Sequence, residues 1–354
     1  MHRKRTARAV LTVALALTAS LAAGTGSASA DPPAVGSGTG VYVGQVPLTT
    51  TRSAATYLLQ DPTRGNTSTS DARAGIVTDA DNVWGNGLAT NRQSAAVDAQ
   101  FTAVAMWDYL KLTFSRVGLA NDGRPIRSVV HYGSNYGNAF WSDACGCVTY
   151  GDGAGNTRPV TELDIGAHEL AHGLTSATAG LGFTGEAGAL NEATSDIFAT
   201  LVEFSANLPA DVPDYFIGEK ADLFGDGTPV RYLDRPSRDG SSPDFWSPAV
   251  AGMDPGAGSG VGDHFFYLLA EGSGRKVING ISYASPTADG SSVTGIGRAA
   301  AAAIWYRALT VYLASDATYH SARAATLSAA GDLYGKGSAE YAAVGAAWTG
   351  VDVA

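Results

Sequence analysis

A histidine pair with one-turn spacing near the middle of the chain is the strongest constraint on its fold. His168 and His172 lie in the segment HELAH, within a predicted helix of about residues 163–179 that ends at Gly180. Residues four apart lie on one face of a helix, so both imidazole rings can reach a single metal ion. Glu169, one position further round, can act on a water molecule at that ion without being a ligand.

A second predicted helix, of about residues 189–207, contributes further polar groups. Glu192 can supply a third ligand from this facing helix. Asp196 and Asn191 can accept hydrogen bonds from the ring nitrogens that the two histidines leave free. These side chains interrupt an otherwise apolar helix, which argues against an ordinary solvated surface. Together they predict a zinc site with one coordination position left for water.

The rest of the chain divides by predicted secondary structure into two parts. Short apolar runs broken by Gly, Asn, Asp and Thr predict strands in the first part, with one helix of about residues 95–116. The second part has helical periodicity, with further helices predicted at about 261–271, 296–314, 319–333 and 338–348. We therefore predict an α+β fold. A β-rich N-terminal domain (41–160) precedes a mainly helical C-terminal domain (161–354), and the 163–179 helix lies at the cleft between them.

The first 40 residues have the composition of a targeting segment and a linker. Residues 1–30 combine a basic start, an apolar run and a small-residue sequence at Ala28–Ala30, and so predict a signal peptide, with an uncleaved membrane anchor as the alternative. Residues 31–40 (DPPAVGSGTG) predict a flexible leader. We therefore expect a secreted, extracellular protein that has no membrane contact after cleavage.

Net charge and cysteine content narrow the possible partners and the compartment. Residues 1–30 hold four of the 23 basic side chains and none of the 33 acidic ones, so the remainder has a net charge of 19 − 33 = −14. Such an acidic surface disfavours nucleic acid and anionic membranes as partners. Cys145 and Cys147, the only cysteines, favour a local disulfide over a metal site, because two thiolates alone make a poor zinc ligand set.

The sequence from about Val41 to Val353 resembles the thermolysin family of neutral metalloproteases. Similar segments occur in the family's order, namely YLLQDPTRGN, TDADN, VHY, NAFWSD, YGDG, HELAHGLT, AGALNEATSDIFATLVEF, GIGRAAAAAIWYRALT and DLYG. The resemblance implies the zincin fold and a monomeric zinc endopeptidase that acts on protein and peptide substrates.

The resemblance also implies a role for each matched residue. The zinc ligands would be His168, His172 and Glu192, with Glu169 as general base and Asn191 and Asp196 as hydrogen-bond partners of the ligands. Three features would bind substrate: the edge strand Asn138, Ala139, Phe140 and Trp141, Arg231 at a carbonyl oxygen, and His264 at the oxyanion. Ile165 and Val230 would line a pocket for a large apolar residue just after the cleaved bond.

Three departures from the family pattern stand out. Phe183 replaces a tyrosine that usually stands beside the oxyanion, a loss for which Tyr232 could compensate. Ser259 replaces the aspartate that usually orients the histidine matched to His264. The stretch between Ala30 and Gly40 leaves no room for the family's long prosegment. We expect slower rather than absent turnover.

A group of acidic residues near the two central helices predicts a calcium site. Asp164 and Glu203 fall at the same end of these helices if the helices are antiparallel, and Asp211, Asp214 and Glu219 follow closely. Lys220 is the only basic residue nearby, so these carboxylates would repel one another without a cation. The positions match the family's main calcium site. Asp79 and Asp81 could mark a second one.

Two functions of other classes stay open. A metal-stabilised binding or adhesion protein that has lost catalysis is favoured by Phe183 and Ser259, and opposed by the intact Glu169 and His264. A secreted serine hydrolase is a weaker alternative, because no G-x-S-x-G turn occurs in the sequence.

Overall fold

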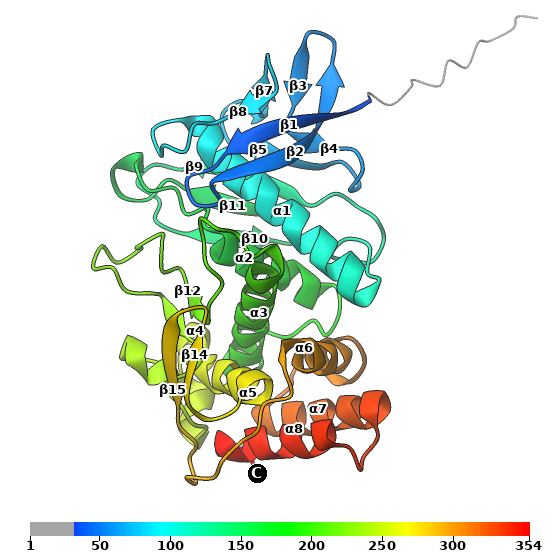
Figure 1. Cartoon of the computed structure of the whole chain (residues 1–354), viewed down its shortest axis with the longest axis vertical. Coiled ribbons are helices and arrows are strands. Elements are labelled where there is room, and N and C mark those ends of the chain that lie inside the picture. Colours follow the sequence, from blue (N-terminus) through cyan, green and yellow to red (C-terminus); the bar gives the residue numbers. More distant parts are fainter. Residues whose placement is uncertain (1–31) are drawn as a thin grey trace, which may run out of the picture. The chain divides into compact units, whose positions relative to one another are not determined.

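The computed structural model describes residues 32–354, with strands concentrated in the first half and helices in the second (Figure 1). This arrangement confirms the predicted α+β fold. Residues 32–354 form one compact unit, so the domain boundary near residue 160 stays a prediction. The predicted signal peptide lies outside the described residues. No helix within residues 32–354 is both long and apolar enough to cross a bilayer.

The strands and helices have the following bounds. The strands are β1 Pro33–Thr39, β2 Gln45–Ser53, β3 Thr56–Leu58, β4 Gln60–Asp61, β5 Thr67–Asp71, β6 Gly75–Ile76, β7 Thr78–Asp79, β8 Val83–Trp84, β9 Arg127–Tyr132, β10 Ala139–Ser142, β11 Cys147–Gly151, β12 Phe216–Ile217, β13 Arg231–Tyr232, β14 Gly274–Ile278 and β15 Ile281–Ser285. The α-helices are α1 Arg92–Phe114, α2 Leu163–Ser176, α3 Gly185–Ala206, α4 Pro255–Gly258, α5 Gly260–Glu271, α6 Arg298–Arg307, α7 Tyr319–Tyr334 and α8 Ala339–Gly350.

Two sheets make up the N-terminal half, and helix α1 packs against strands of both (Figure 1). One sheet has the order β7-β3-β2-β1-β8. The other has the order β10-β11-β9-β5-β4, with β6 added to β5, so β10 is an edge strand. The backbone groups on its outer side are therefore free of sheet partners and can pair with an extended peptide.

The predicted flexible leader is wrong for Pro33–Thr39, which form strand β1. This strand pairs antiparallel with β2 along its whole length. Just after it, the fully buried carboxylate of Asp98 on α1 accepts the backbone N–H groups of Val41, Tyr42 and Val43. A Cβ at Gly40 would lie 2.0 Å from Asp98 Oδ1, so only glycine fits this close approach. Small residues thus serve packing here rather than flexibility.

Strand β5, of sequence TSTSD, has no apolar pattern and could not be predicted from periodicity. It is nevertheless central, because it pairs with β4, β6 and β9. Its buried hydroxyl groups are satisfied internally: Thr67 Oγ1 donates to the Arg64 carbonyl, and Thr69 Oγ1 donates to Gln100 Oε1. Hydrogen bonding replaces apolar burial as the reason for the strand's position.

Helices α2 and α3 form the centre of the molecule (Figure 1). They pack against each other, and α2 also contacts α1, β10 and β11, while α3 contacts α4 and α5. Both helices are buried over most of their length. Their inward position explains why polar residues on them are held in fixed directions. The described portion also contains the β14–β15 hairpin, whose Asn279-Gly280 turn has positive φ at both residues, as is typical of a two-residue hairpin turn.

Candidate functional site

The three predicted metal ligands converge at the α2–α3 contact. His168 Nε2 lies 3.4 Å from Glu192 Oε2, and His172 Nε2 lies 3.5 Å from Glu192 Oε1. One ligand atom from each residue falls within 4.8 Å of the others. Two ligands bonded to a tetrahedral zinc ion at 2.0–2.1 Å are about 3.3 Å apart. The three side chains therefore fit a zinc ion.

Each histidine is fixed through its other ring nitrogen. His168 Nδ1 lies 2.7 Å from Asp196 Oδ1, and His172 Nδ1 lies 2.9 Å from Asn191 Oδ1. With Nδ1–H donating to these acceptors, each ring presents a lone pair at Nε2, the form that metal binding requires. Asn191 is held in turn, because its Nδ2 donates to the Leu181 carbonyl. The sequence prediction named Asp196 and Asn191 as the two acceptors without assigning either to a particular histidine.

The charges of this cluster balance within the protein. Burial lowers the pKa of His168, but the adjoining Asp196 carboxylate outweighs it and raises the pKa to about 10. Burial would raise the pKa of Glu192, but its hydrogen bond with His168 holds that pKa well below the ordinary value. Arg231 donates from Nε and Nη2 to Asp196 and completes the balance. Because metal binding requires the neutral ring, a metal ion would compete with protonation of His168.

Glu169 lies beside these ligands but is not one of them. Its Oε2 accepts the backbone N–H of Trp141 on the edge strand at 3.0 Å. Burial raises the pKa of its carboxyl group to about 7, with His168 opposing the shift. A carboxylate with such a pKa can take up and return a proton near neutral pH.

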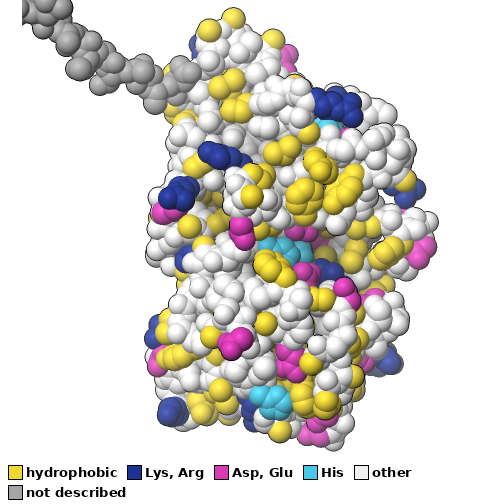
Figure 2. Space-filling view, turned by 180° about the vertical axis from the view of Figure 1, so that it is seen from behind, with side chains coloured by type: hydrophobic (Ala, Val, Ile, Leu, Met, Phe, Trp, Pro, Cys, Tyr) yellow, Lys and Arg dark blue, Asp and Glu magenta, His cyan; other side chains and the backbone are white. Residues whose placement is uncertain are grey.

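A cavity of about 300 Å³ opens at the cluster. It is lined by the three ligands, Glu169 and Arg231, and also by Asn138, Ile165 and Val230. Ile217 and Leu223 complete its apolar wall; sequence reasoning missed both, because neither lies near a motif. Figure 2 shows histidine side chains in the middle of one face, with acidic, basic and hydrophobic side chains around them.

The predicted role of His264, which was to bind the oxyanion, is wrong. Its side chain is fully buried, and both ring nitrogens are used inside the protein: Nδ1 contacts the Asp244 carbonyl at 2.7 Å, and Nε2 contacts Ser285 Oγ at 2.8 Å. It therefore cannot reach an oxyanion in the cavity. Ser259 does not orient this ring either, because the acceptors for its hydroxyl proton are Asp263 Oδ2 and the Gly256 carbonyl, each at 2.9 Å.

Among residues 32–354, no side-chain hydroxyl or imidazole lines the cavity on the Phe183 side of Glu192. A second cavity, of about 360 Å³, adjoins Glu192 and Arg231 and is lined further by Phe183 and Gly256, among others. Phe183 is 65% exposed and donates nothing. Tyr232 does not replace a donor there, because it is buried against Phe216 and lines a different cavity. Nη1 of Arg231 is the charged donor on this side without a hydrogen bond to residues 32–354.

The predicted calcium ligands gather at the other end of α2. Asp164, Glu203, Asp211 and Asp214 are all buried. The ligand atoms of Asp211, Glu219 and Glu162 lie within 4.8 Å of one another. Glu162 was missed by sequence reasoning, although it stands two residues before Asp164. Burial is the main reason that the pKa values of these carboxyl groups are raised.

The remaining predicted residues form local structures. Asp79 accepts the backbone N–H groups of Asp81 and Asn82 in one turn, and no third acidic or histidine ligand joins the two aspartates within the described chain. Cys145 and Cys147 are joined by a disulfide at the β10–β11 hairpin.

Comparisons with known proteins agree with this architecture. The family models for the thermolysin metallopeptidase catalytic domain and its alpha-helical domain match residues 35–176 and 179–353. The chain is 50% identical over 324 residues to a transglutaminase-activating metalloprotease of Streptomyces mobaraensis, covering 90% of this chain and 42% of that protein. It is 41% identical over 333 residues to a bacillolysin of Bacillus cereus, covering 90% and 55%.

A solved structure has the same fold. The precursor of protealysin, a metalloproteinase from Serratia proteamaculans, superposes with a TM-score of 0.60 at 28% identity, covering 81% of this chain and 87% of that one. The chain spans about half the length of the curated relatives cited here. Matches to both domains of one family, over nearly all the described residues, show that this chain belongs to the thermolysin family of metallopeptidases, a family that implies zinc.

Proposed function

We propose that this chain is a secreted zinc endopeptidase with His168, His172 and Glu192 as its zinc ligands. The observation that carries the proposal is the convergence of both Nε2 atoms on the Glu192 carboxylate at 3.4 and 3.5 Å. Secretion rests on the sequence of residues 1–30. A bound zinc ion would supply a Lewis acid that acidifies a water molecule and polarises a peptide carbonyl.

Glu169 is the general base of this proposal. It is buried beside the ligands, and its pKa of about 7 suits a group that first accepts a proton and then gives it to the departing amine. The Trp141 N–H group holds one of its oxygens, which leaves the other oxygen to meet the attacking water. Asp196 and Asn191 keep the two imidazole rings in the metal-binding tautomer.

The substrate backbone would pair with the outer side of β10, whose partner β11 lies on the inner side. Backbone pairing is independent of side chains, so many sequences could bind. Selectivity would come from the apolar cavity wall of Ile165 and Val230, which favours a large apolar residue after the cleaved bond. Arg231 would donate from Nη1 to a substrate oxygen, since its other nitrogens already bind Asp196.

The acidic cluster beyond Asp164 is proposed as a structural calcium site. Glu203 Oε1 is buried without a hydrogen-bond partner, and oxygen-rich clusters of this kind suit calcium. Its ligands would be Glu162, Asp164, Glu203, Asp211, Asp214 and Glu219. Two members of the cluster, Asp164 and Glu203, lie on the same helices as the zinc ligands, and the others come from the segments before α2 and after α3, so a cation here would tie these segments to both helices.

A second candidate function is a zinc-stabilised binding protein with little or no catalysis. The observation that favours it is the cavity beside Glu192, which is lined by the exposed Phe183 and by no hydroxyl or imidazole of the described residues. Loss of one oxyanion donor costs about 3–4 kcal/mol in enzymes that have such donors. Intact Glu169 favours the peptidase.

Casein digestion separates the two candidates. The purified protein should bind about one zinc ion per chain, cleave casein, lose cleavage on treatment with a zinc chelator and regain it on addition of zinc. A folded, zinc-loaded protein that leaves casein and short peptides intact would instead support the binding protein. Cleavage that persists after zinc removal would contradict both.

A further inference from the structure

Glu162 stands immediately before helix α2, but its side chain does not cap that helix. The side chain is fully buried, and both of its oxygens bind a segment that is distant in the sequence. Oε1 accepts the backbone N–H of Lys220 at 2.9 Å, and Oε2 accepts that of Ala221 at 2.7 Å. A carboxylate that accepts two consecutive N–H groups fixes both the position and the orientation of that backbone. Neither hydrogen bond is needed for a calcium ligand.

Asp164 holds the start of the same segment. Its Oδ2 accepts the N–H of Gly218, and its Oδ1 accepts that of Ile165 in its own helix. Three of the four N–H groups of residues 218–221 are therefore taken by two carboxylates at the beginning of α2. Residues 218–221 belong to no helix or strand, so the bonds to these carboxylates fix their position.

Segment 218–221 adjoins the wall of the apolar cavity at the metal cluster. Ile217 comes just before the segment and Leu223 shortly after it, and both line that cavity. The backbone at Gly218 also touches two other wall residues, because a Cβ there would lie 2.8 Å from Val230 Cγ2 and 3.5 Å from Ile165 Cδ1. A shift of the segment would therefore change the width of the cavity.

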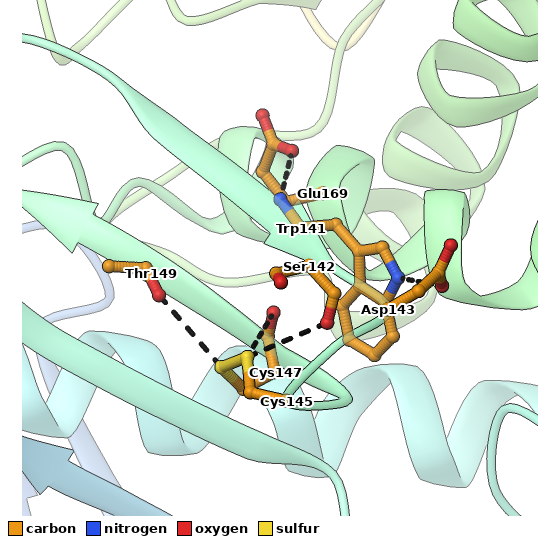
Figure 3. The surroundings of a disulfide bond; sticks show 7 residues. All are labelled: Trp141, Ser142, Asp143, Cys145, Cys147, Thr149 and Glu169. Carbon is orange, nitrogen blue, oxygen red and sulfur yellow. Dashed lines mark hydrogen bonds between the residues drawn. A yellow bond between two sulfur atoms is a disulfide. The ribbon is translucent and has the colours of Figure 1, made fainter. Parts of the chain in front are cut away.

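A carboxylate of α2 also holds a second segment that would contact the substrate. Glu169 Oε2 accepts the N–H of Trp141 on the edge strand β10, as Figure 3 shows. About two helical turns separate Glu169 from Glu162. The helix that carries two of the proposed zinc ligands is thus bonded both to the strand that would pair with the substrate backbone and to the segment beside the apolar cavity.

We propose that Glu162 is a positioning residue that sets the selectivity of the apolar cavity through its two bonds to segment 218–221. While the segment is held, Ile217 and Leu223 form a wall that packs on a large apolar residue after the cleaved bond. Without these bonds the wall recedes, and the close packing on which a large side chain depends is lost first. This inference rests on the proposed peptidase function.

The test uses two fluorescence-quenched peptides that differ only in Leu or Ala just after the cleaved bond, with zinc and calcium saturating. Apolar pockets discriminate about 10–200-fold for one methylene group, so kcat/KM should be about 50-fold higher for the Leu peptide. Glu162→Gln keeps the shape of the side chain but turns one acceptor into a donor, so one N–H group loses its partner. A hydrogen bond to a carboxylate accounts for about a tenfold change in an equilibrium, so the ratio should fall to about five.

Glu203→Gln is the matched control, because it makes the same change within the same acidic cluster. In residues 32–354 the Glu203 side chain accepts the N–H of Asp214 and has no hydrogen bond to segment 218–221. This variant should therefore keep the ratio of the unaltered protein when calcium saturates. An equal fall of the ratio in both variants would show that selectivity depends on the acidic cluster as a whole and would overturn the role of Glu162.

Leu223→Ala tests whether the effect passes through the cavity wall. Alone it should lower the ratio, because it removes part of the wall. Adding Glu162→Gln to Leu223→Ala should then change the ratio by less than about twofold, since two changes that act on one contact are not additive. A further tenfold fall in the double variant would contradict a positioning role that acts through this wall.

Amide hydrogen exchange in the Glu169→Gln protein tests the two bonds without turnover. The amides of Lys220 and Ala221 should exchange slowly although they lie outside helices and strands, and adding Glu162→Gln should make at least one exchange about tenfold faster. Rapid exchange of both amides while Glu162 is intact would overturn the proposal, whether or not the Glu162 variant folds. If unaltered, zinc-loaded protein cleaves no peptide, the proposed function fails, and dissociation constants of the two peptides then test the selectivity.

Discussion

The proposed zinc and calcium sites, which both include residues of helices α2 and α3, differ in how their charge is balanced. At the proposed zinc site, the Glu192 carboxylate faces two imidazole rings, and Asp196 is paired with Arg231. The pKa of Glu192 is accordingly held below its ordinary value, despite burial. At the proposed calcium site, burial raises the pKa of Asp214 to about 7 and that of Glu219 to about 10, and neighbouring carboxylates add to the effect.

This difference indicates that the two metals would have different roles. The zinc ligands are held in place by protein groups, so the fold should persist when zinc is absent. The calcium ligands repel one another until a cation binds, so the fold there should depend on calcium. Changes at the first cluster should therefore affect activity with little effect on stability, and changes at the second, apart from the selectivity assigned to Glu162, should do the reverse.

The largest effect is expected at Glu169. Glu169→Gln keeps the size of the side chain and removes the base, so kcat/KM should fall by about 10²–10⁴-fold. Zinc content and the thermal unfolding midpoint should stay close to those of the unaltered protein, because Glu169 is not a ligand. Peptide cleavage, metal analysis and calorimetry check the three expectations. A variant that keeps most of its activity would remove Glu169 from the mechanism.

Calcium removal should have the next largest effect, on stability. Calcium at about 100 times its dissociation constant contributes about 2.7 kcal/mol to the free energy of unfolding, and a calcium-selective chelator should remove that contribution. The experiment is best done with Glu169→Gln, which cannot digest itself, while zinc is kept saturating. Glu203→Gln, which removes one buried carboxylate, should reduce the calcium dependence. An unfolding midpoint that does not change with calcium concentration would show that the cluster binds no calcium.

The pH dependence of the calcium-free protein should run opposite to the usual acid denaturation. The pKa of Asp214 is 3.8 in its ordinary state and about 7 when folded, so between these values the folded protein binds more protons than the unfolded chain. Its free energy of unfolding should fall as pH rises from about 5 to about 7, by about 1.4 kcal/mol per pH unit for each such carboxyl.

Urea unfolding at pH 5, 6 and 7 measures this slope. Saturating calcium should abolish it, because the bound cation favours the ionised carboxylates. A calcium-free protein whose stability rises with pH would mean that the buried carboxyl groups are ionised and otherwise compensated.

The sequence was sufficient for the parts of the site that lie within regular helices. The four-residue spacing of His168 and His172 fixes their direction as soon as a helix is assumed, and Glu192 needed only a facing helix. Asp196 and Asn191 followed from the same geometry. Helix periodicity was likewise enough for the positions of the long helices.

The sequence predictions failed where the direction or burial of a side chain depends on contacts with residues distant in the sequence. His264 also lies on a helix, but α5 directs it into the protein, where Asp244 and Ser285 occupy both ring nitrogens. Strand β5 has no periodic pattern because hydroxyl groups fill its buried positions. Glu162 joins Asp211 and Glu219 only after the chain has folded back over about fifty residues. None of these contacts leaves a local signal in the sequence.

The smallest effect is expected at Lys220, which is the only basic residue of the described chain that forms a salt bridge within the acidic cluster. Its Nζ lies 2.9 Å from Asp211 Oδ1 and also donates to the Ala210 carbonyl, so it partly fills the place of a bound cation. Its side chain is 35% exposed, so the contact should contribute less than about 1 kcal/mol. Lys220→Met should therefore lower the unfolding midpoint of calcium-free protein by about 2 °C.

The same comparison of Lys220→Met with the unaltered protein is then made with calcium bound. Because the Lys220 ammonium group and calcium compete for the same carboxylates, Lys220→Met should bind calcium more tightly and match the unaltered protein once calcium saturates. Lys336→Met, which removes an exposed lysine after α7, should change neither measurement. If Lys220→Met were equally destabilised with and without calcium, its ammonium group would be an independent structural contact. The negative charge of the acidic cluster would then be compensated by protein groups, as it is at the proposed zinc site.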